Sequence, residues 1–486
     1  MPKKPDETYI EYKHRVIDTV SSSYCASKWL NATIWLGSGA TTSCHHPPAH
    51  KADLEEIKTN PSALHNTQHK KQMRKLMLEG KRPSECDYCW KIEDMGRDAV
   101  SDRVFKTVIY DDAEVKATTE LPWDADADLK TLEIAFDRTC NFACSYCNAS
   151  FSTTWAKDIK KNGPYQNMVS DGAGAFQHDG GWAQPYRYSS DNPYVKAFWE
   201  WWPKLSTTLT ELRITGGEPL MSGDVWKLLD YFEKNGLGDM RFAINSNLGA
   251  KDGLIEKFIA KSKSIGGLDL YTSCEATGKQ AEYIRDGLVW DEWVGNCEKI
   301  MEEANLRGFH VMMTINGLCL FSITDMFDLM LDWKARYGRQ KAPTWSVNIL
   351  RFPSFMSPLA LPDAVKDERR EHLRAWFNRS KDNPLMSEME RDGIARLIDY
   401  LEVVNDPHRA TSSMETRHRD IRSFHEQYDE RRGKDFREAF PELVEWYNDV
   451  PLTDLGTLQE MIDGDSTKQV AQEEGWVLEP KPENPS

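Results

Sequence analysis

The sequence predicts an α/β protein built on an open, partial (β/α)6 barrel. Residues 131–358 alternate short apolar runs with longer amphipathic stretches, which is typical of parallel strands joined by helices. Six units are too few to close an eight-stranded barrel, so an open one is expected. Polar or glycine-rich strings (CNFACSYC, GGEP, NSN and SCE) follow the first four strands, where such barrels place their chemistry. The expected strands are residues 131–136, 211–215, 240–245, 268–274, 310–316 and 345–350.

The rest of the chain divides into segments of different composition. Residues 1–105 hold four of the ten cysteines, and the acidic, proline-containing stretch 106–130 reads as a linker. Residues 150–205 form a long connection within the barrel segment, read either as a lid or binding loop or as a solvated insertion. Residues 359–486 show helical periodicity, and the last dozen of them are expected to be disordered.

Bulk properties exclude several classes of protein. A net charge of −16 disfavours binding to nucleic acid, whose phosphates it repels. No apolar run approaches the roughly 20 residues that span a bilayer, and the charged N-terminus lacks the apolar region of a signal peptide. We therefore expect a cytoplasmic protein whose clustered cysteines bind metal and do not form disulfides.

Three cysteines follow the first expected strand of the barrel. Cys140, Cys144 and Cys147 have the spacing Cys-x3-Cys-x2-Cys. A four-iron cubane normally takes four cysteine ligands, so three thiolates leave one iron open for chemistry. The alternatives are a zinc site without a visible fourth ligand, or buried free thiols. Zinc sites favour paired Cys-x2-Cys knuckles, and the spacing therefore favours an open iron–sulfur cluster.

The string CNFACSYC together with GGEP resembles the radical S-adenosylmethionine superfamily. The resemblance covers residues 131–358 and implies the partial barrel of that family. It also implies an enzyme in which the three cysteines hold a [4Fe–4S] cluster whose open iron binds S-adenosylmethionine. A one-electron reductant such as flavodoxin or ferredoxin then drives cleavage to methionine and a 5′-deoxyadenosyl radical.

The family pattern assigns roles near the first two strands. Tyr146, the aromatic residue before the third cysteine, is expected beside the adenine of S-adenosylmethionine. Gly216, Gly217 and Glu218 are expected to meet the methionine amino group through backbone carbonyls and a carboxylate. Glycine suits that place because it lets a backbone approach a ligand closely.

Further roles fall after the third and fourth strands. Ser246 and Asn247 either contact the ligand or cap the following helix. Ser273, Glu275 and Arg285 resemble the fourth-strand pattern for ribose and carboxylate contacts. The planar guanidinium of Arg285 suits a carboxylate, although a surface charge is the other reading.

A second metal site is expected before the barrel. Cys25 and Cys44 fit Cys-x13-Gly-x4-Cys with Gly39, and Cys86 and Cys89 follow as CDYC after an amphipathic helix in residues 64–85. This resembles the twitch domain, a shortened SPASM extension in which four cysteines ligate an auxiliary [4Fe–4S] cluster. In better-known members that domain follows the barrel, whereas here it precedes it. A four-cysteine structural zinc site is the alternative.

Five other potential ligands have simpler explanations. His45 and His46 either replace one cysteine or lie beside the site as supporting or surface groups. Cys274, Cys297 and Cys319 fall on barrel elements and are expected to be small buried apolar groups.

The resemblance implies hydrogen abstraction from a peptide or small polar substrate by the 5′-deoxyadenosyl radical. With the auxiliary cluster as electron acceptor, the net reaction would be an oxidation or a crosslink. A non-catalytic iron–sulfur electron carrier and a zinc-stabilised binding protein are the other classes. GGEP and the SCE…R pattern disfavour the carrier, which needs no cofactor pocket.

Overall fold

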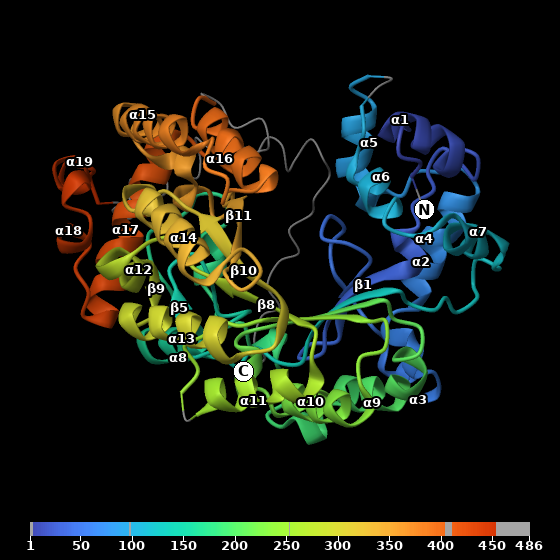
Figure 1. Cartoon of the computed structure of the whole chain (residues 1–486). Helices are drawn as coiled ribbons and strands as arrows, with labels where there is room; N and C mark the ends of the chain where they lie inside the picture. The colour runs from blue at the N-terminus through green and yellow to red at the C-terminus, as the bar shows by residue number, and fades with distance from the viewer. Residues whose placement is uncertain (1–2, 97–98, 252, 404–410, 453–486) are drawn as a thin grey trace, which may run out of the picture. The chain divides into compact units, whose positions relative to one another are not determined.

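The computed structural model describes residues 3–96, 99–251, 253–403 and 411–452, and it is a mixed α/β fold with a large, mostly parallel sheet (Figure 1). The chain divides into two compact units. The first unit contains Met1–Thr139, Trp182–Ser246 and Ala260–Asp269. The second unit contains Cys140–Gly181, Asn247–Ile259 and Leu270–Ser486.

The structure confirms the six strands expected from the sequence. They are β4 (Thr131–Ala135), β6 (Glu211–Thr215), β7 (Arg241–Asn245), β8 (Leu268–Ser273), β10 (Leu306–Ile315) and β11 (Thr344–Ile349). In the first unit the strand order is β8-β7-β6-β4-β1-β2-β3, and in the second it is β11-β10-β8, since β8 has residues in both. The register places Leu132 of β4 opposite Leu212 of β6, and Leu212 opposite Phe242 of β7. These side chains are fully buried and anchor the first unit's core.

The N-terminal segment extends this sheet. Strand β1 (Asn31–Trp35) pairs in parallel with β4, and β2 (Ala40–Thr42) and β3 (His50–Lys51) continue the edge in antiparallel pairing. The segment that we expected to hold only a cluster domain therefore also supplies strands beside the first expected barrel strand.

The helices of the first unit include the amphipathic helix predicted in residues 64–85. That helix is α4, and Gly80 follows it with a φ of +73°, as expected for a glycine turn. The stretch 106–130 expected to be a linker carries a capped helix, α7. The helices are α1 (Tyr9–Tyr12), α2 (Ser27–Leu30), α3 (Leu54–Thr59), α4 (Gln68–Leu78), α5 (Asp87–Glu93), α6 (Asp102–Thr107), α7 (Asp112–Glu120), α9 (Pro193–Leu205) and α10 (Gly223–Asn235).

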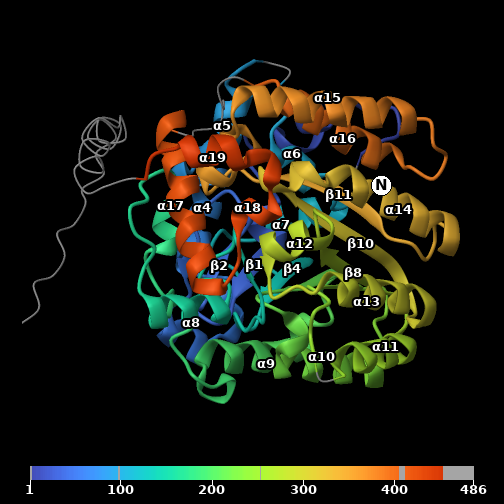
Figure 2. The same cartoon turned by 90° about the vertical axis from the view of Figure 1, so that its left-hand side faces the viewer.

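The helices of the second unit confirm the helical periodicity predicted beyond residue 359. Helices α15 and α16 lie side by side in both views (Figure 1, Figure 2). The tail expected to be disordered lies outside the described residues. The helices are α8 (Thr153–Asn162), α12 (Gly278–Ile284), α13 (Trp290–Glu303), α14 (Ile323–Tyr337), α15 (Asp363–Ser380), α16 (Glu388–Tyr400), α17 (Met414–Arg432), α18 (Phe436–Ala439) and α19 (Val444–Asp449); α11 (Leu254–Ile265) has residues in both units.

The long connection 150–205 begins with α8 and ends with α9, so its irregular part is shorter than the sequence suggested.

Among the residues that the structure describes, no helix has the length and apolar character needed to cross a bilayer.

A buried ion pair ties α14 to α16 in the second unit. Lys334 Nζ lies 2.6 and 2.7 Å from the two carboxylate oxygens of Glu390. Glu390 also accepts the backbone N–H of Trp345 in β11 at 3.1 Å. Both side chains are buried, so each charge depends on the other for solvation.

Replacing Lys334 with methionine is expected to destabilise the protein by about 3–5 kcal/mol, because Glu390 would keep a buried charge without its cation. Denaturant unfolding measures this loss. Lys381→Met, which removes an exposed lysine after α15, is the matched control and is expected to change stability by less than about 0.5 kcal/mol. Equal stabilities of the two variants would contradict the role of the pair.

Candidate metal centres

The structure brings the four N-terminal cysteines together around one pocket in the first unit. Cys25 precedes α2, Cys44 follows β2, Cys86 ends a short 3-10 helix (Ser84–Cys86) and Cys89 lies in α5. All four side chains line the pocket, and all but the partly buried Cys44 belong to the surrounding hydrophobic core. Four thiols that line one pocket are the donor set that a closed four-cysteine metal site requires, but no three of these sulfurs lie within 4.8 Å of one another.

Hydrogen-bond donors already face the sulfurs of this four-cysteine site. The backbone N–H of His46 donates to Cys44, and the backbone N–H of Arg103 donates to Cys89. Burial nevertheless raises the pKa of both Cys86 and Cys89 to about 12. Burial thus favours the protonated thiols, and a metal that binds them must displace their protons.

Two buried cations line the same pocket. Arg103 Nε lies 2.6 Å from Glu93, and Lys28 forms an ion pair with Glu85. Burial lowers the pKa of Lys28, but the facing Cys86 and Glu85 outweigh burial and raise it above its usual value. The pocket thus combines four thiols with two buried cations, each of which is paired with a carboxylate.

His45 and His46 contact Asp102 beside this pocket. His46 Nε2 lies 2.6 Å from Asp102 Oδ2, and the His46 ring stacks on Tyr88 at 3.9 Å between centroids. The two histidines hold the pKa of Asp102 well below its usual value. Within the described part of the chain, His45, His46 and Asp102 are the one closely spaced group of three metal-ligand side chains. Since Asp102 engages the His46 ring, this geometry favours a supporting role for His46 over direct ligation.

The three-cysteine loop of the second unit pairs with the chain around Arg285. Strand β5 (Ala143–Cys144) is antiparallel to β9 (Arg285–Asp286), with Cys144 opposite Arg285. Arg285 Nη1 lies 3.9 Å from Cys144 Sγ, and its Nη2 lies 2.5 Å from Glu275. The side chains of Arg285 and Glu275 are only 5% and 1% exposed. The Tyr146 hydroxyl donates to Glu275 at 3.2 Å, so four of the predicted site residues form one contact group.

The three cysteines of this loop are partly buried, and hydrogen-bond donors face some of their sulfurs. The Phe142 N–H donates to Cys140 Sγ at 3.4 Å, and Asn247 Nδ2 lies 4.0 Å from the same sulfur. Burial raises the pKa of Cys144 to about 11, while the Arg285 cation works in the opposite direction. Burial, with the neighbouring Cys144 and Cys140, raises the pKa of Cys147 further.

Other predicted residues of the second unit have structural partners. Asn247 donates to Asn141 at 2.9 Å and accepts the N–H of Gly249, and it does not cap α11, which begins at Leu254. The helix-cap reading of this residue is therefore wrong. Ser273 ends β8 and is partly exposed. Cys274, Cys297 and Cys319 are fully buried, as expected.

The glycines of GGEP lie against the chain that leads into the cysteine loop. In the first unit, a Cβ on Gly217 would lie 2.3 Å from the carbonyl oxygen of Thr139 and 2.6 Å from that of Arg138. Gly216 has a φ of +129°. The Glu218 N–H donates to the same Thr139 oxygen at 2.6 Å. These glycines are thus required by close contact between two backbone segments, a reason that differs from the ligand approach we predicted.

The side chains of Glu218 and Ser246 also meet in the first unit. Ser246 donates to Glu218 Oε1 at 2.8 Å, and the Leu220 N–H donates to the same oxygen at 3.0 Å. Glu218 is almost completely buried. Ser246 therefore positions the Glu218 carboxylate, and it does not cap α11 either.

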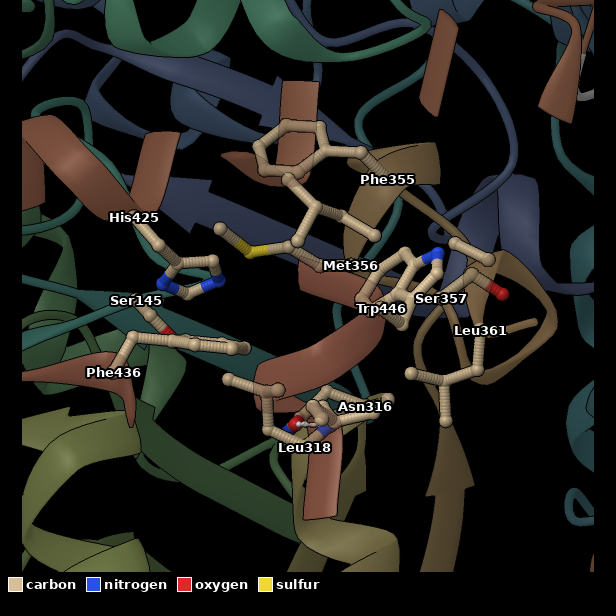
Figure 3. Close-up of a pocket in the computed structure, with 14 residues that line it drawn as sticks. Ser145, Asn316, Leu318, Phe355, Met356, Ser357, Leu361, His425, Phe436 and Trp446 are labelled. Atoms are coloured by element: carbon tan, nitrogen blue, oxygen red, sulfur yellow. Dashed lines mark hydrogen bonds between the residues drawn. The ribbon is translucent and has the colours of Figure 1, made fainter. Parts of the chain in front are cut away.

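Helix α17 of the second unit supports the cysteine loop from the C-terminal region. Figure 3 shows a small, mostly apolar cavity whose lining includes Ser145 of the loop and, next to it in the view, His425 of α17. Tyr428 of α17 donates to the carbonyl of Ala143 at 3.1 Å. His425 Nδ1 and the Tyr283 hydroxyl lie 3.0 Å apart. No local pattern in the sequence predicts this support, because these contacts join positions 285 and 142 residues apart.

A comparison with models of known protein families gives no match, and a comparison with curated protein sequences gives none either. The case for a function therefore depends on the residues and contacts described above.

Gly217→Ala is expected to destabilise the protein by about 1–3 kcal/mol, because the new methyl group would clash with the backbone of residues 138–139. Gly223→Ala, at the start of α10, is the control: its methyl group would meet nothing within 4 Å. Thermal or urea unfolding of both variants tests this. A Gly217→Ala protein as stable as wild type would show that the backbone contact is not tight.

Proposed function

We propose that the chain is a radical S-adenosylmethionine enzyme with one catalytic and one auxiliary [4Fe–4S] cluster. The observation that carries the proposal is the contact group of Cys144, Tyr146, Glu275 and Arg285. These residues come from two separate sequence motifs, for which the family resemblance implies one cofactor site. An isolated buried thiol would need neither a facing arginine nor its carboxylate partner.

The donor sets fit the two clusters. Three cysteines in one short loop fit a cluster with an open iron, and four cysteines around one pocket fit a closed cluster suited to electron transfer. When loaded, the open cluster would supply the electron that cleaves S-adenosylmethionine to methionine and a 5′-deoxyadenosyl radical, which abstracts hydrogen from the substrate. The partial (β/α)6 barrel is part of this proposal.

The chain's own residues have defined tasks under this proposal. In the second unit, Arg285 opposes Cys144 and lowers the energy of its thiolate, while Glu275 and Tyr146 fix the guanidinium in place. Asn247 donates toward Cys140. In the first unit, Ser246 and the Leu220 N–H hold the Glu218 carboxylate in one orientation. The substrate class remains a peptide or small polar molecule, by analogy with twitch enzymes.

Anaerobic reconstitution is expected to load about eight irons and eight sulfides per chain, because two cubanes form. Replacing Cys25, Cys44, Cys86 and Cys89 together with alanine should reduce this to about four irons. Iron and sulfide analysis with metal quantification provides the measurement. Zinc without iron in the wild-type protein would overturn the proposal in favour of a zinc-stabilised protein.

Cys144→Ala is expected to abolish formation of 5′-deoxyadenosine from S-adenosylmethionine under a strong reductant, since two cysteines cannot hold the open cluster. Chromatography of the products measures this loss. The control is Cys297→Ala, which removes a buried cysteine of α13 outside both metal sites and should retain the product. If reconstituted wild-type protein holds iron but yields no 5′-deoxyadenosine, the electron-carrier reading is favoured instead.

A further inference from the structure

A buried histidine beside the cysteine loop of the second unit has a ring nitrogen without a hydrogen-bond partner. His425 of α17 is 2% exposed, and its Nδ1 lies 3.0 Å from the Tyr283 hydroxyl. Its other ring nitrogen, Nε2, has no hydrogen-bond partner among the residues that the structure describes. A buried polar atom of this kind costs free energy unless a ligand or a water satisfies it.

The neighbours of His425 decide which of its nitrogens carries the proton. The Tyr283 hydroxyl has one proton and donates it to Asp429 Oδ1 at 2.6 Å, so its oxygen is left to accept from His425. We therefore assign the proton of the neutral ring to Nδ1, which leaves a bare lone pair on Nε2. Burial lowers the pKa of His425 to about 3, so the ring is neutral at pH 7 and Nε2 is a hydrogen-bond acceptor.

The cavity in Figure 3 gives this acceptor room for a ligand. The His425 ring is directed into the cavity, and Ser145, whose side chain also has no hydrogen-bond partner in the described chain, lines it as well. The side chains of Asn316 and Ser357, which complete the lining, already bond to the backbone. The volume of about 20 Å³ is room for about one water or one hydroxyl group. A single hydroxyl group suits this space, because it can donate to Nε2 and accept from Ser145.

We propose that this cavity binds a hydroxyl group of the substrate, with His425 Nε2 accepting its hydrogen bond and the Ser145 hydroxyl donating to its oxygen. The inference rests on the proposed function and deepens it, because it makes the substrate a hydroxyl-bearing molecule. Ser145 stands between Cys144 and Tyr146, so the hydroxyl group is held next to the loop of the open cluster. Without the histidine acceptor, a mostly apolar cavity would not prefer a hydroxyl to a methyl group.

Crystals of the full chain soaked in methanol test the binding, with acetonitrile as the probe that has no proton to donate. The methanol oxygen is expected within hydrogen-bond distance of both His425 Nε2 and Ser145 Oγ, whereas acetonitrile should not enter the cavity. His425→Phe keeps an aromatic ring but removes the acceptor, and Ser145→Ala removes the donor. Each variant is expected to lose the bound methanol.

The reconstituted enzyme tests the link to the reaction, with methanol deuterated on its carbon in place of the substrate. A deuterium atom is expected to move from this carbon to the 5′ carbon of the deoxyadenosyl radical, so that one C–D bond breaks, one forms, and a methanol carbon radical remains. Mass spectrometry of 5′-deoxyadenosine measures the deuterium. His425→Phe and Ser145→Ala are each expected to lower the deuterated fraction about tenfold, while undeuterated 5′-deoxyadenosine still forms.

The matched control is His372→Phe, which replaces an exposed histidine of α15 in the same unit and should keep both the bound methanol and the deuterium. If one cavity variant fails to fold, the other decides. A cavity without methanol, a cavity that takes up acetonitrile equally well, or binding at crystal concentration only, with equal deuterium transfer in wild type and variants, would overturn the inference. Methanol bound in the cavity of a protein that forms no 5′-deoxyadenosine would instead overturn the proposed function.

Discussion

Burial of sulfur next to buried positive charge is the constraint that organises both cysteine groups. A thiol removed from water holds its proton, and the raised pKa of Cys86, Cys89 and Cys144 reflects that cost. The structure offsets it with cations that are themselves buried. Arg285 faces Cys144 in the second unit, and Lys28 lies near Cys86 in the first. Each cation has a carboxylate partner of its own. Arg285 pairs with Glu275, which also accepts a hydrogen bond from Tyr146. Lys28 pairs with Glu85. Charge solvation thereby fixes the geometry of residues that lie far apart in sequence.

The parallel pairing of β1 with β4 gives the N-terminal cysteines a rigid frame. Cys25 precedes α2, which leads directly into β1, and Cys44 follows the neighbouring strand β2. Two of the four cysteines therefore lie in segments that lead into or out of the strands at this sheet edge, and the other two lie in α5 and the short helix before it. A cluster domain placed before the barrel segment in the chain is consistent with this arrangement, because strand pairing depends on spatial neighbours and not on chain order. The position of the four cysteines before residue 131 is thus compatible with the strand pairing of the first unit.

The elements that the sequence predicted well are those with local signals. The six expected strands and the helices α4, α15 and α17 each have continuous apolar runs or helical periodicity, and the structure confirms them. Strand β1 was not predicted, because its five residues pair with residues 131–135, which lie a hundred positions later in the chain. Sequence motifs predicted the candidate site residues, but they did not predict which residues those side chains contact. Nothing local in the sequence indicates that Arg285 pairs with Glu275, that Gly217 packs on Thr139, or that α4 buries Lys70 and Arg74.

Both cysteine groups pair the cations beside their sulfurs with carboxylates. Arg285 donates to Glu275 through two nitrogens. Lys28 and Arg103, which line the four-cysteine pocket, form ion pairs with Glu85 and Glu93. Each carboxylate offsets part of its partner's charge and so limits how far that cation stabilises a more negative centre. Under the proposed function, the two clusters would therefore differ chiefly in their ligands, because three cysteines leave one iron open to S-adenosylmethionine and four cysteines close the other cluster.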